Sequence, residues 1–333
     1  MLIRPALREY RTWLLDSRYW HGYTPRVDDI IIATAPKCGT TWMQQIVSSL
    51  VFGDGEVRAL PKVSPWVEAR FRYSAAEVKA VVAGLPHRRF LKTHLPIDGL
   101  PLYDEVKYIH VGRDGRDAFL SMHNHFTGFT PEHLAMLDAV GLADPVVARP
   151  YERTPADPVA YLRQWLAAKT TPGPVEGPPS PHFFDLERGY WAERHRPNVL
   201  LVHYADLLRD LAAEMRRIAA FLEIAIDDSL WPLLERAAGF AAMRASGKQL
   251  MPLTQTMLID GAKRFFDKGV TGRWQGVLAA DDLALYERTA RERLGPALAA
   301  WLAGGRHEAG DPRGLRDGAE ADAAALTSDG DLS

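Results

Sequence analysis

The sequence has very little cysteine and no long hydrophobic run. Cys38 is the only cysteine among 333 residues, which excludes an internal disulfide and a zinc site built from several cysteines. No stretch of 18 or more apolar residues occurs, so no transmembrane helix is predicted. The first twenty residues lack the continuous apolar segment of a secretory signal. Together these absences predict a cytoplasmic protein.

The charge is nearly balanced. Forty Lys and Arg residues stand against 42 Asp and Glu residues, for a formal net charge of -2. Chains that bind nucleic acid usually carry a basic excess or a long basic run, so we expect no nucleic-acid partner. The length is ample for one large domain with a buried core.

Four short apolar runs rich in β-branched residues predict buried strands. Helical patterns separate them, and strands that alternate with helices are typical of a parallel sheet covered on both faces. We therefore predict an α/β fold, a P-loop-like parallel sheet in a single domain. The predicted strands are Ile30–Ala33, Arg89–Thr93, Lys107–Val111 and Val199–Tyr204, and the predicted helices are Thr40–Phe52, Asp114–Phe126 and Leu207–Leu222.

Two segments depart from this alternation. Thr171–Pro181 contains five prolines and two glycines, which predicts a long loop of the kind that often forms a lid. From Gly304 onward bulky apolar residues are scarce. We expect residues 1–303 to form the domain and residues 304–333 to be a disordered tail.

The segment after the first predicted strand has the properties of a phosphate-binding loop. Gly39 allows close approach of the backbone to a ligand, and the free N–H groups of the next helical turn attract anions. Lys37 adds a positive charge, and Thr40 and Thr41 add hydroxyls. An ordinary capped turn would explain Thr40 alone. In the Walker A motif Lys follows Gly directly, so a P-loop kinase or NTPase is the weaker alternative.

A second pattern follows the third predicted strand. Arg113 stands at the strand end, and Ser121 comes eight residues later. Asp114 and Asp117 suit the start of a helix. A capped helix explains both acidic residues but gives no reason for the arginine and the serine.

In their order and spacing these segments resemble the cytosolic sulfotransferase family. Pro36–Trp42 is similar to the family's Pro-Lys-Ser-Gly-Thr-Thr-Trp loop, with Cys38 in place of Ser, and the likeness extends over roughly Asp28–Trp274. Val63–Trp66 and His110–Asp114 are similar to bacterial members that act on glycolipids and other natural products. The resemblance implies transfer of a sulfuryl group from 3′-phosphoadenosine 5′-phosphosulfate (PAPS) to a hydroxyl. The acceptor would be a small, largely apolar alcohol, phenol or glycolipid, and adenosine 3′,5′-bisphosphate (PAP) would be released.

The resemblance also implies roles for single residues. His94 would be the general base for the acceptor hydroxyl, as its ordinary pKa allows, and Lys37 and Lys92 would stabilise the charge on the transferred group. A lone histidine after a strand is, however, more often a packing residue. The cofactor would be held by Lys37, Cys38, Gly39, Thr40 and Thr41 at the 5′-phosphate, by Trp42, Tyr204 and Phe240 at the adenine, and by Arg113, Ser121, Lys268 and Gly269 at the 3′-phosphate.

Near the C-terminus the chain departs from the family pattern. Asp267 stands where the family has an Arg that binds phosphate, and Arg273 stands where Asp is usual. An Asp beside a phosphate would repel it. Either Asp267 pairs with Arg273 while Lys268 or Arg264 serves the phosphate, or PAPS binds more weakly. The positions that match the family's dimer signature, Gln275, Ala279, Ala280 and Ala284, do not carry it, so the oligomeric state stays open.

The remaining expectations concern reactivity and the acceptor. Cys38 lies beside Lys37 and before a helix N-terminus, which predicts a lowered thiol pKa and alkylation by iodoacetamide. Trp66, Phe126 and Phe129 are candidates for an apolar acceptor pocket. No acidic Mg²⁺ site is evident, so we expect no metal. A non-catalytic nucleotide-binding protein on the same fold is a further alternative, favoured only by Asp267.

Overall fold

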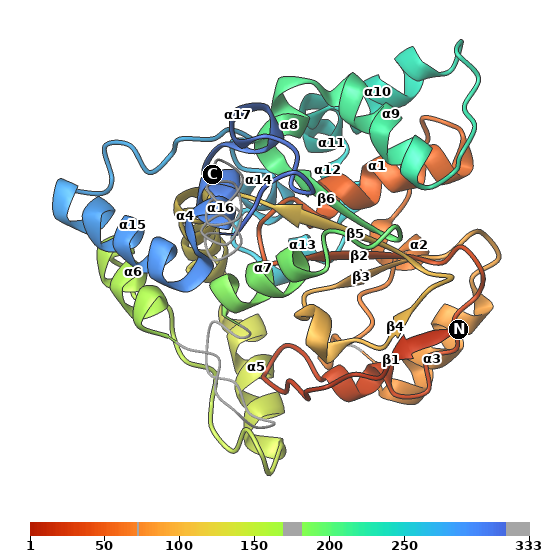
Figure 1. Ribbon diagram of the computed structural model, residues 1–333. Helices are drawn as coiled ribbons and strands as arrows, with labels where there is room; N and C mark the ends of the chain where they lie inside the picture. Colours follow the sequence, from red (N-terminus) through yellow and green to blue (C-terminus); the bar gives the residue numbers. More distant parts are fainter. Residues whose placement is uncertain (72, 169–181, 318–333) are drawn as a thin grey trace, which may run out of the picture.

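The computed structural model describes residues 1–71, 73–168 and 182–317. At its centre lies a parallel sheet in the strand order β3-β2-β5-β6 (Figure 1). The strands are β2 (Ile30–Thr34), β3 (Phe90–Thr93), β5 (Lys107–Gly112) and β6 (Val199–His203). The predicted α/β fold is therefore confirmed, with strand boundaries within one residue of those expected.

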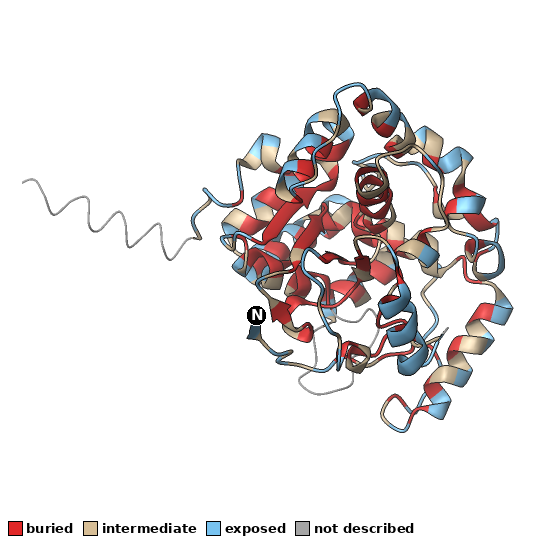
Figure 2. Ribbon diagram, turned by 90° about the vertical axis from the view of Figure 1, so that its right-hand side faces the viewer, coloured by how far each residue is buried: buried red, intermediate tan, exposed pale blue. Residues whose placement is uncertain are grey.

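Both faces of the sheet are apolar, and helices cover both. Ile30 and Ile32 belong to one core cluster, with α1 (Thr40–Phe52). The residues between and after them, Ile31 and Ala33, belong to a second cluster on the other face. Successive side chains of a strand point to opposite faces, so a continuous apolar run needs a helical layer on each side. Figure 2 shows the strands buried between helices whose outer faces are exposed.

The helix predictions are correct for two of the three segments. α1 has the expected bounds, and α4 (Gly115–Phe126) begins one residue late because Asp114 is its N-cap. The single helix predicted for Leu207–Leu222 is wrong. Asp210 takes a non-helical conformation, with φ -149°, and its side chain accepts a hydrogen bond from the main chain of Ala213. Aspartate competes with the helix in this way, so two helices form, α8 (Tyr204–Arg209) and α9 (Leu211–Phe221).

The other elements surround this framework. Strands β1 (Leu2–Arg4) and β4 (Leu102–Tyr103) form a small antiparallel pair. The short 3₁₀ helices are η1 (Ser17–Trp20) and η2 (Ile97–Gly99). The remaining helices are α2 (Leu60–Val63), α3 (Ala75–Gly84), α5 (Pro131–Ala143), α6 (Pro158–Ala167), α7 (Phe183–Ala192), α10 (Trp231–Ala238), α11 (Phe240–Ala245), α12 (Gly247–Leu250), α13 (Thr254–Met257), α14 (Gly261–Phe265), α15 (Ala280–Leu294), α16 (Pro296–Gly304) and α17 (Arg306–Ala309). None of the helices in the described ranges has the length and apolar character needed to cross a membrane.

Residues 305–317, the described part of the segment after Gly304, pack against the domain. Arg194 is buried and donates hydrogen bonds to the carbonyls of Pro312 (3.0 Å) and Leu315 (3.1 Å). The main-chain N–H of Arg306 donates to Asp206 at 2.8 Å. The predicted disordered tail is therefore wrong for residues 304–317. Their main-chain groups satisfy buried charged side chains, which requires few bulky apolar residues. Residues 318–333 and the predicted Thr171–Pro181 loop lie outside the described residues.

We expect Arg194→Ala to lower the free energy of unfolding by roughly 2–4 kcal/mol, because it leaves several main-chain carbonyls without their donor. Urea unfolding measures this loss. Arg188→Ala is the matched control, since the Arg188 side chain is 61% exposed and its loss should cost less than about 0.5 kcal/mol. Equal stability of the two variants would show that the C-terminal segment is not held through Arg194.

Candidate active site

A cavity of about 500 Å³ lies at the carboxyl ends of the parallel strands. Ligands of open α/β sheets bind at this edge. Lys37 follows β2, Lys92 and His94 lie at the end of β3, and Arg113 follows β5. Apart from Cys38 and Arg264, the alternative phosphate-binding residue, every residue given a catalytic, cofactor-binding or acceptor-binding role from the sequence lines the cavity, namely Lys37, Gly39, Thr40, Thr41, Trp42, Trp66, Lys92, His94, Arg113, Ser121, Phe126, Phe129, Tyr204, Phe240, Lys268 and Gly269.

The loop before α1 is built to expose main-chain N–H groups. Lys37 and Gly39 both have positive φ, 67° and 104°. A Cβ on Gly39 would lie 3.0 Å from the ring of Tyr204, so this position needs glycine. No side chain caps the N-terminus of α1, and its free N–H groups are therefore available to an anion.

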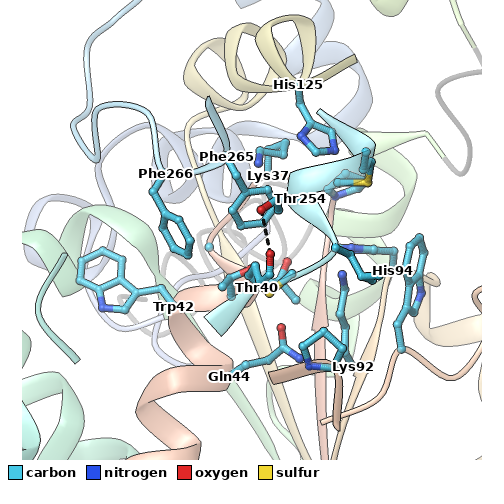
Figure 3. Close-up of a pocket in the computed structure, with 18 of the residues that line it drawn as sticks. Lys37, Thr40, Trp42, Gln44, Lys92, His94, His125, Thr254, Phe265 and Phe266 are labelled. Carbon is cyan, nitrogen blue, oxygen red and sulfur yellow. Dashed lines mark hydrogen bonds between the residues drawn. The ribbon is translucent and has the colours of Figure 1, made fainter. Parts of the chain in front are cut away.

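Three cationic side chains, Lys37, Lys92 and Arg113, line the cavity (Figure 3 labels the two lysines). Burial, together with the nearby Arg113 and Lys92, lowers the pKa of Lys37 to about 7. Burial also lowers the pKa of Lys92 to about 8. Arg113 donates to the carbonyls of Lys37 (2.9 Å) and Val270 (3.3 Å), while its buried Nε has no partner among the described residues. These cations and the orphaned donor suit a phosphorylated ligand, so the residues fit PAPS.

His94 is held in one tautomer. Its Nδ1 lies 2.8 Å from the main-chain carbonyl of Thr34, an acceptor only, so Nδ1 carries the proton and Nε2 keeps a lone pair. Burial and the neighbouring Lys92 lower the pKa of His94 well below its usual range. The ring meets Trp66 edge-on, with centroids 5.0 Å apart. His94 is therefore a neutral base that faces the cavity beside two lysines.

Glu68 was not identified from the sequence, but it holds His94 and the residues around it in place. Its buried carboxylate accepts hydrogen bonds from the main chain of His94 (2.7 Å), the hydroxyl of Thr93 (3.0 Å) and the indole of Trp66 (2.6 Å). Burial raises the pKa of Glu68. No local pattern marks this residue, because its partners come together only in the folded chain.

Aromatic rings line the end of the cavity where the resemblance implies adenine. Trp42 meets Tyr204 edge-on at 5.3 Å, and the guanidinium of Arg113 lies 4.2 Å from the centre of the Tyr204 ring. Gly269 has φ 65°, and a Cβ there would come within 2.6 Å of the Phe240 ring. Any side chain at position 269 would clash with Phe240, so the loop after α14 needs glycine there to pack against this ring.

The reversed charges near the C-terminus form an ion pair. Arg273 lies 2.7 Å from the carboxylate of Asp267, as one of the two alternatives from the sequence requires. Asp117 fixes this loop by accepting from the main chain of Gly272 and Arg273. Arg264, the other residue suggested for the phosphate, bonds to Asn124 and Thr127 and does not line the cavity. Lys268 does line it.

The acceptor side of the cavity is mostly aromatic. Trp66, Phe126 and Phe129 line the cavity, and their contact with an acceptor stays a prediction. Two histidines that the sequence did not single out also line it, His125 on α4 and His133 on α5. His125 lies one helical turn beyond Ser121, so helical periodicity was the signal for it.

A sulfotransferase domain model matches residues 27–296. The chain belongs to the sulfotransferase family. The chain is 34% identical over 314 residues to a glycolipid sulfotransferase of Mycobacterium bovis, with 89% of this chain and 94% of the relative covered. It is 26% identical over 310 residues to mouse sulfotransferase 1B1, with 85% and 93% covered.

Two solved structures share the fold of this chain. Mouse sulfotransferase SULT7A1 complexed with PAP aligns with a TM-score of 0.61 at 20% identity, covering 86% of this chain and 93% of that one. Retinol dehydratase in complex with androsterone and PAP aligns with a TM-score of 0.64 at 20% identity, covering 84% and 86%. Within residues 1–71, 73–168 and 182–317 of this chain, no three His, Cys, Asp or Glu side chains are grouped to hold a metal ion.

The prediction of a reactive Cys38 is wrong. Its side chain is fully buried in the core cluster on one face of the sheet and does not line the cavity. Burial raises the pKa of the thiol well above its usual range, outweighing Arg113 and Lys37. Lys37 and the start of α1 lie next to Cys38 in sequence, as the prediction required, but the turn directs the sulfur into the core and away from the cavity.

We therefore expect iodoacetamide to leave Cys38 of the folded protein unmodified and the protein active, because a buried thiol does not ionise. Mass spectrometry after timed exposure measures this, with the urea-unfolded chain as the positive control. Rapid alkylation of the folded chain, slowed by PAP, would restore the original prediction.

We also expect proton uptake when PAP binds. At pH 8 Lys37, with its pKa lowered to about 7, is largely neutral in the free protein. An anion beside it favours the charged form, so binding raises that pKa and takes up as much as about one proton. PAP affinity should therefore fall as the pH rises above about 7. Calorimetry in HEPES and in Tris detects the uptake as a difference in heat. Equal heats in both buffers, or uptake unchanged in Lys37→Met, would contradict this account.

Proposed function

We propose that this chain transfers a sulfuryl group from PAPS to a hydroxyl of a small, largely apolar acceptor. Membership in the sulfotransferase family supports the reaction class. The cluster of Lys37, Lys92 and Arg113 around one cavity supports a highly anionic co-substrate. Two structures of the same fold, named above, were solved with PAP. These observations favour sulfuryl transfer over the kinase alternative and over a non-catalytic nucleotide-binding protein.

The cationic residues bind and orient the donor. The N-terminus of α1 and Lys37 face the 5′-phosphosulfate, and Arg113 with Ser121 faces the 3′-phosphate. Lys37 and Lys92 offset the negative charge that develops as the sulfuryl group moves, which is the role that electrostatic preorganisation plays in phosphoryl transfer. Asp267, paired with Arg273, presents less charge to the phosphate than a free carboxylate would.

His94 accepts the proton of the acceptor hydroxyl. The observation that carries this assignment is the hydrogen bond between its Nδ1 and the carbonyl of Thr34, because it leaves the Nε2 lone pair for the acceptor. The low pKa of His94 keeps the ring neutral throughout the physiological range, so its Nε2 lone pair is free to accept a proton. The carboxylate of Glu68 positions His94 by accepting a hydrogen bond from the main-chain N–H of His94.

The acceptor lies against the aromatic side of the cavity. Trp66, Phe126 and Phe129 offer apolar contact area there, so alcohols, phenols and glycolipids with an apolar body are suitable acceptors. One relative named above is a glycolipid sulfotransferase. A cytoplasmic location for this activity stays a prediction.

We expect His94→Asn to lower kcat by ~10²–10⁴, the usual contribution of one general base. Asn keeps a donor for the carbonyl of Thr34 but has no basic nitrogen. The dissociation constant of PAP, measured by calorimetry, should change less than about threefold, because the base acts on the acceptor. A variant that keeps most of its kcat would remove His94 from the chemical step.

A further inference from the structure

Two histidine rings on the acceptor side of the cavity each have one buried nitrogen without a hydrogen-bond partner among the described residues. Nδ1 of His125 and Nε2 of His133 are buried, and neither has a partner among the described residues. Both rings line the cavity (Figure 3 labels His125). Buried polar atoms are normally paired, so two orphans on one cavity wall point to a ligand.

Both rings are neutral. Burial lowers the pKa of His133 to about 4, and burial together with Lys37 and Lys92 lowers that of His125 well below its usual range. Arg264 adds to the positive charge that His125 faces. A neutral imidazole presents one donor and one acceptor. A hydroxyl matches both, whereas a carboxylate only accepts and an ammonium only donates.

The surroundings of the two rings are aromatic. Phe129 packs edge-on against His125 at 5.3 Å and against His133 at 4.6 Å. Phe126 lies 5.5 Å from His125, and Phe71 lies 6.1 Å from His133. The two orphaned nitrogens are therefore isolated polar points on an apolar wall. A purely apolar ligand would leave them unpaired.

We propose that His125 and His133 determine acceptor specificity by binding hydroxyls other than the one that is sulfated. The acceptor then carries a polyhydroxylated head group, such as a sugar, on an apolar body. This inference rests on the proposed sulfuryl transfer and assigns the two histidines no part in the chemical step. The head group occupies the side of the cavity formed by α4 and α5, and the apolar body packs against the phenylalanine rings.

Three acceptors test the substrate class with labelled PAPS. 1-Octanol and octyl β-D-glucoside share the same alkyl chain and differ in the sugar, and 4-nitrophenol represents a simple phenol. The wild type should prefer the glucoside over octanol by at least about tenfold in kcat/KM, the effect expected of one well-made hydrogen bond. Equal or better use of octanol or the phenol overturns this inference but leaves sulfuryl transfer intact. No transfer to any of the three overturns both.

Variants test the two residues. His125→Phe and His133→Phe keep the aromatic packing and remove the polar atoms, so each should lower kcat/KM for the glucoside by about tenfold. Use of octanol and the dissociation constant of PAP should change less than about twofold. His123→Gln is the matched control on α4, since His123 bonds to Pro155 and Ala156 and does not line the cavity. It should leave the preference unchanged.

A second pair of variants restores a polar group at the position of the unpaired nitrogen of each ring, Nδ1 in His125 and Nε2 in His133. Asn places its amide near the position of Nδ1, and Gln places its amide near Nε2. His125→Asn and His133→Gln should therefore recover most of the preference that the phenylalanine variants lose. A preference that falls equally in the phenylalanine and amide variants would show that a polar group restored at these positions does not restore recognition of the sugar, and it would overturn the proposal. An equal loss for octanol and glucoside would overturn it as well.

Discussion

The hydrogen bond from His94 Nδ1 to the carbonyl of Thr34 connects the central sheet to the proposed general base. Thr34 ends β2, and His94 follows β3, so the bond joins the ends of neighbouring parallel strands. The hydroxyl of Thr34 also bonds to that of Thr40 at the start of α1. One residue therefore sets the tautomer of His94 and anchors the start of α1. Any shift between β2 and β3 would disturb both.

Burial and clustered charge together explain why this edge of the sheet suits an anion. Lys37, Lys92 and Arg113 surround one cavity, and the carboxylate on its wall, Asp267, is paired with Arg273. Cations held together out of water favour their neutral forms, as the lowered pKa of Lys37 shows. An anionic ligand relieves this repulsion. The same arrangement suits the proposed transfer of a group that carries negative charge.

The parts that the sequence predicts well depend on local patterns. The apolar runs gave the strands, and because parallel strands end at one edge, residues after different strands had to meet there. That reasoning brought Lys37, His94 and Arg113 together before the fold was known. Helical periodicity from Ser121 would also have identified His125.

The parts that the sequence predicts poorly depend on the direction of one side chain or on distant partners. Cys38 had activating neighbours in sequence, but the turn around Lys37, with φ 67°, sends the thiol into the core. The segment after Gly304 is ordered through main-chain carbonyls that bind Arg194, and composition does not reveal such contacts. Glu68 accepts hydrogen bonds from Thr93 of β3, from His94 just after that strand and from its neighbour Trp66, and only the fold brings these groups together.

The most direct test of the central claim is a single-turnover experiment. Protein in excess over ³⁵S-labelled PAPS is mixed with a hydroxyl acceptor, and the label is followed by chromatography. The account predicts that label appears on the acceptor, in a 1:1 ratio with released PAP and without added metal, and that it stays in PAPS when the acceptor is omitted. Label that stays in PAPS when acceptors are present, or that appears only as inorganic sulfate, would contradict transfer from PAPS to a hydroxyl.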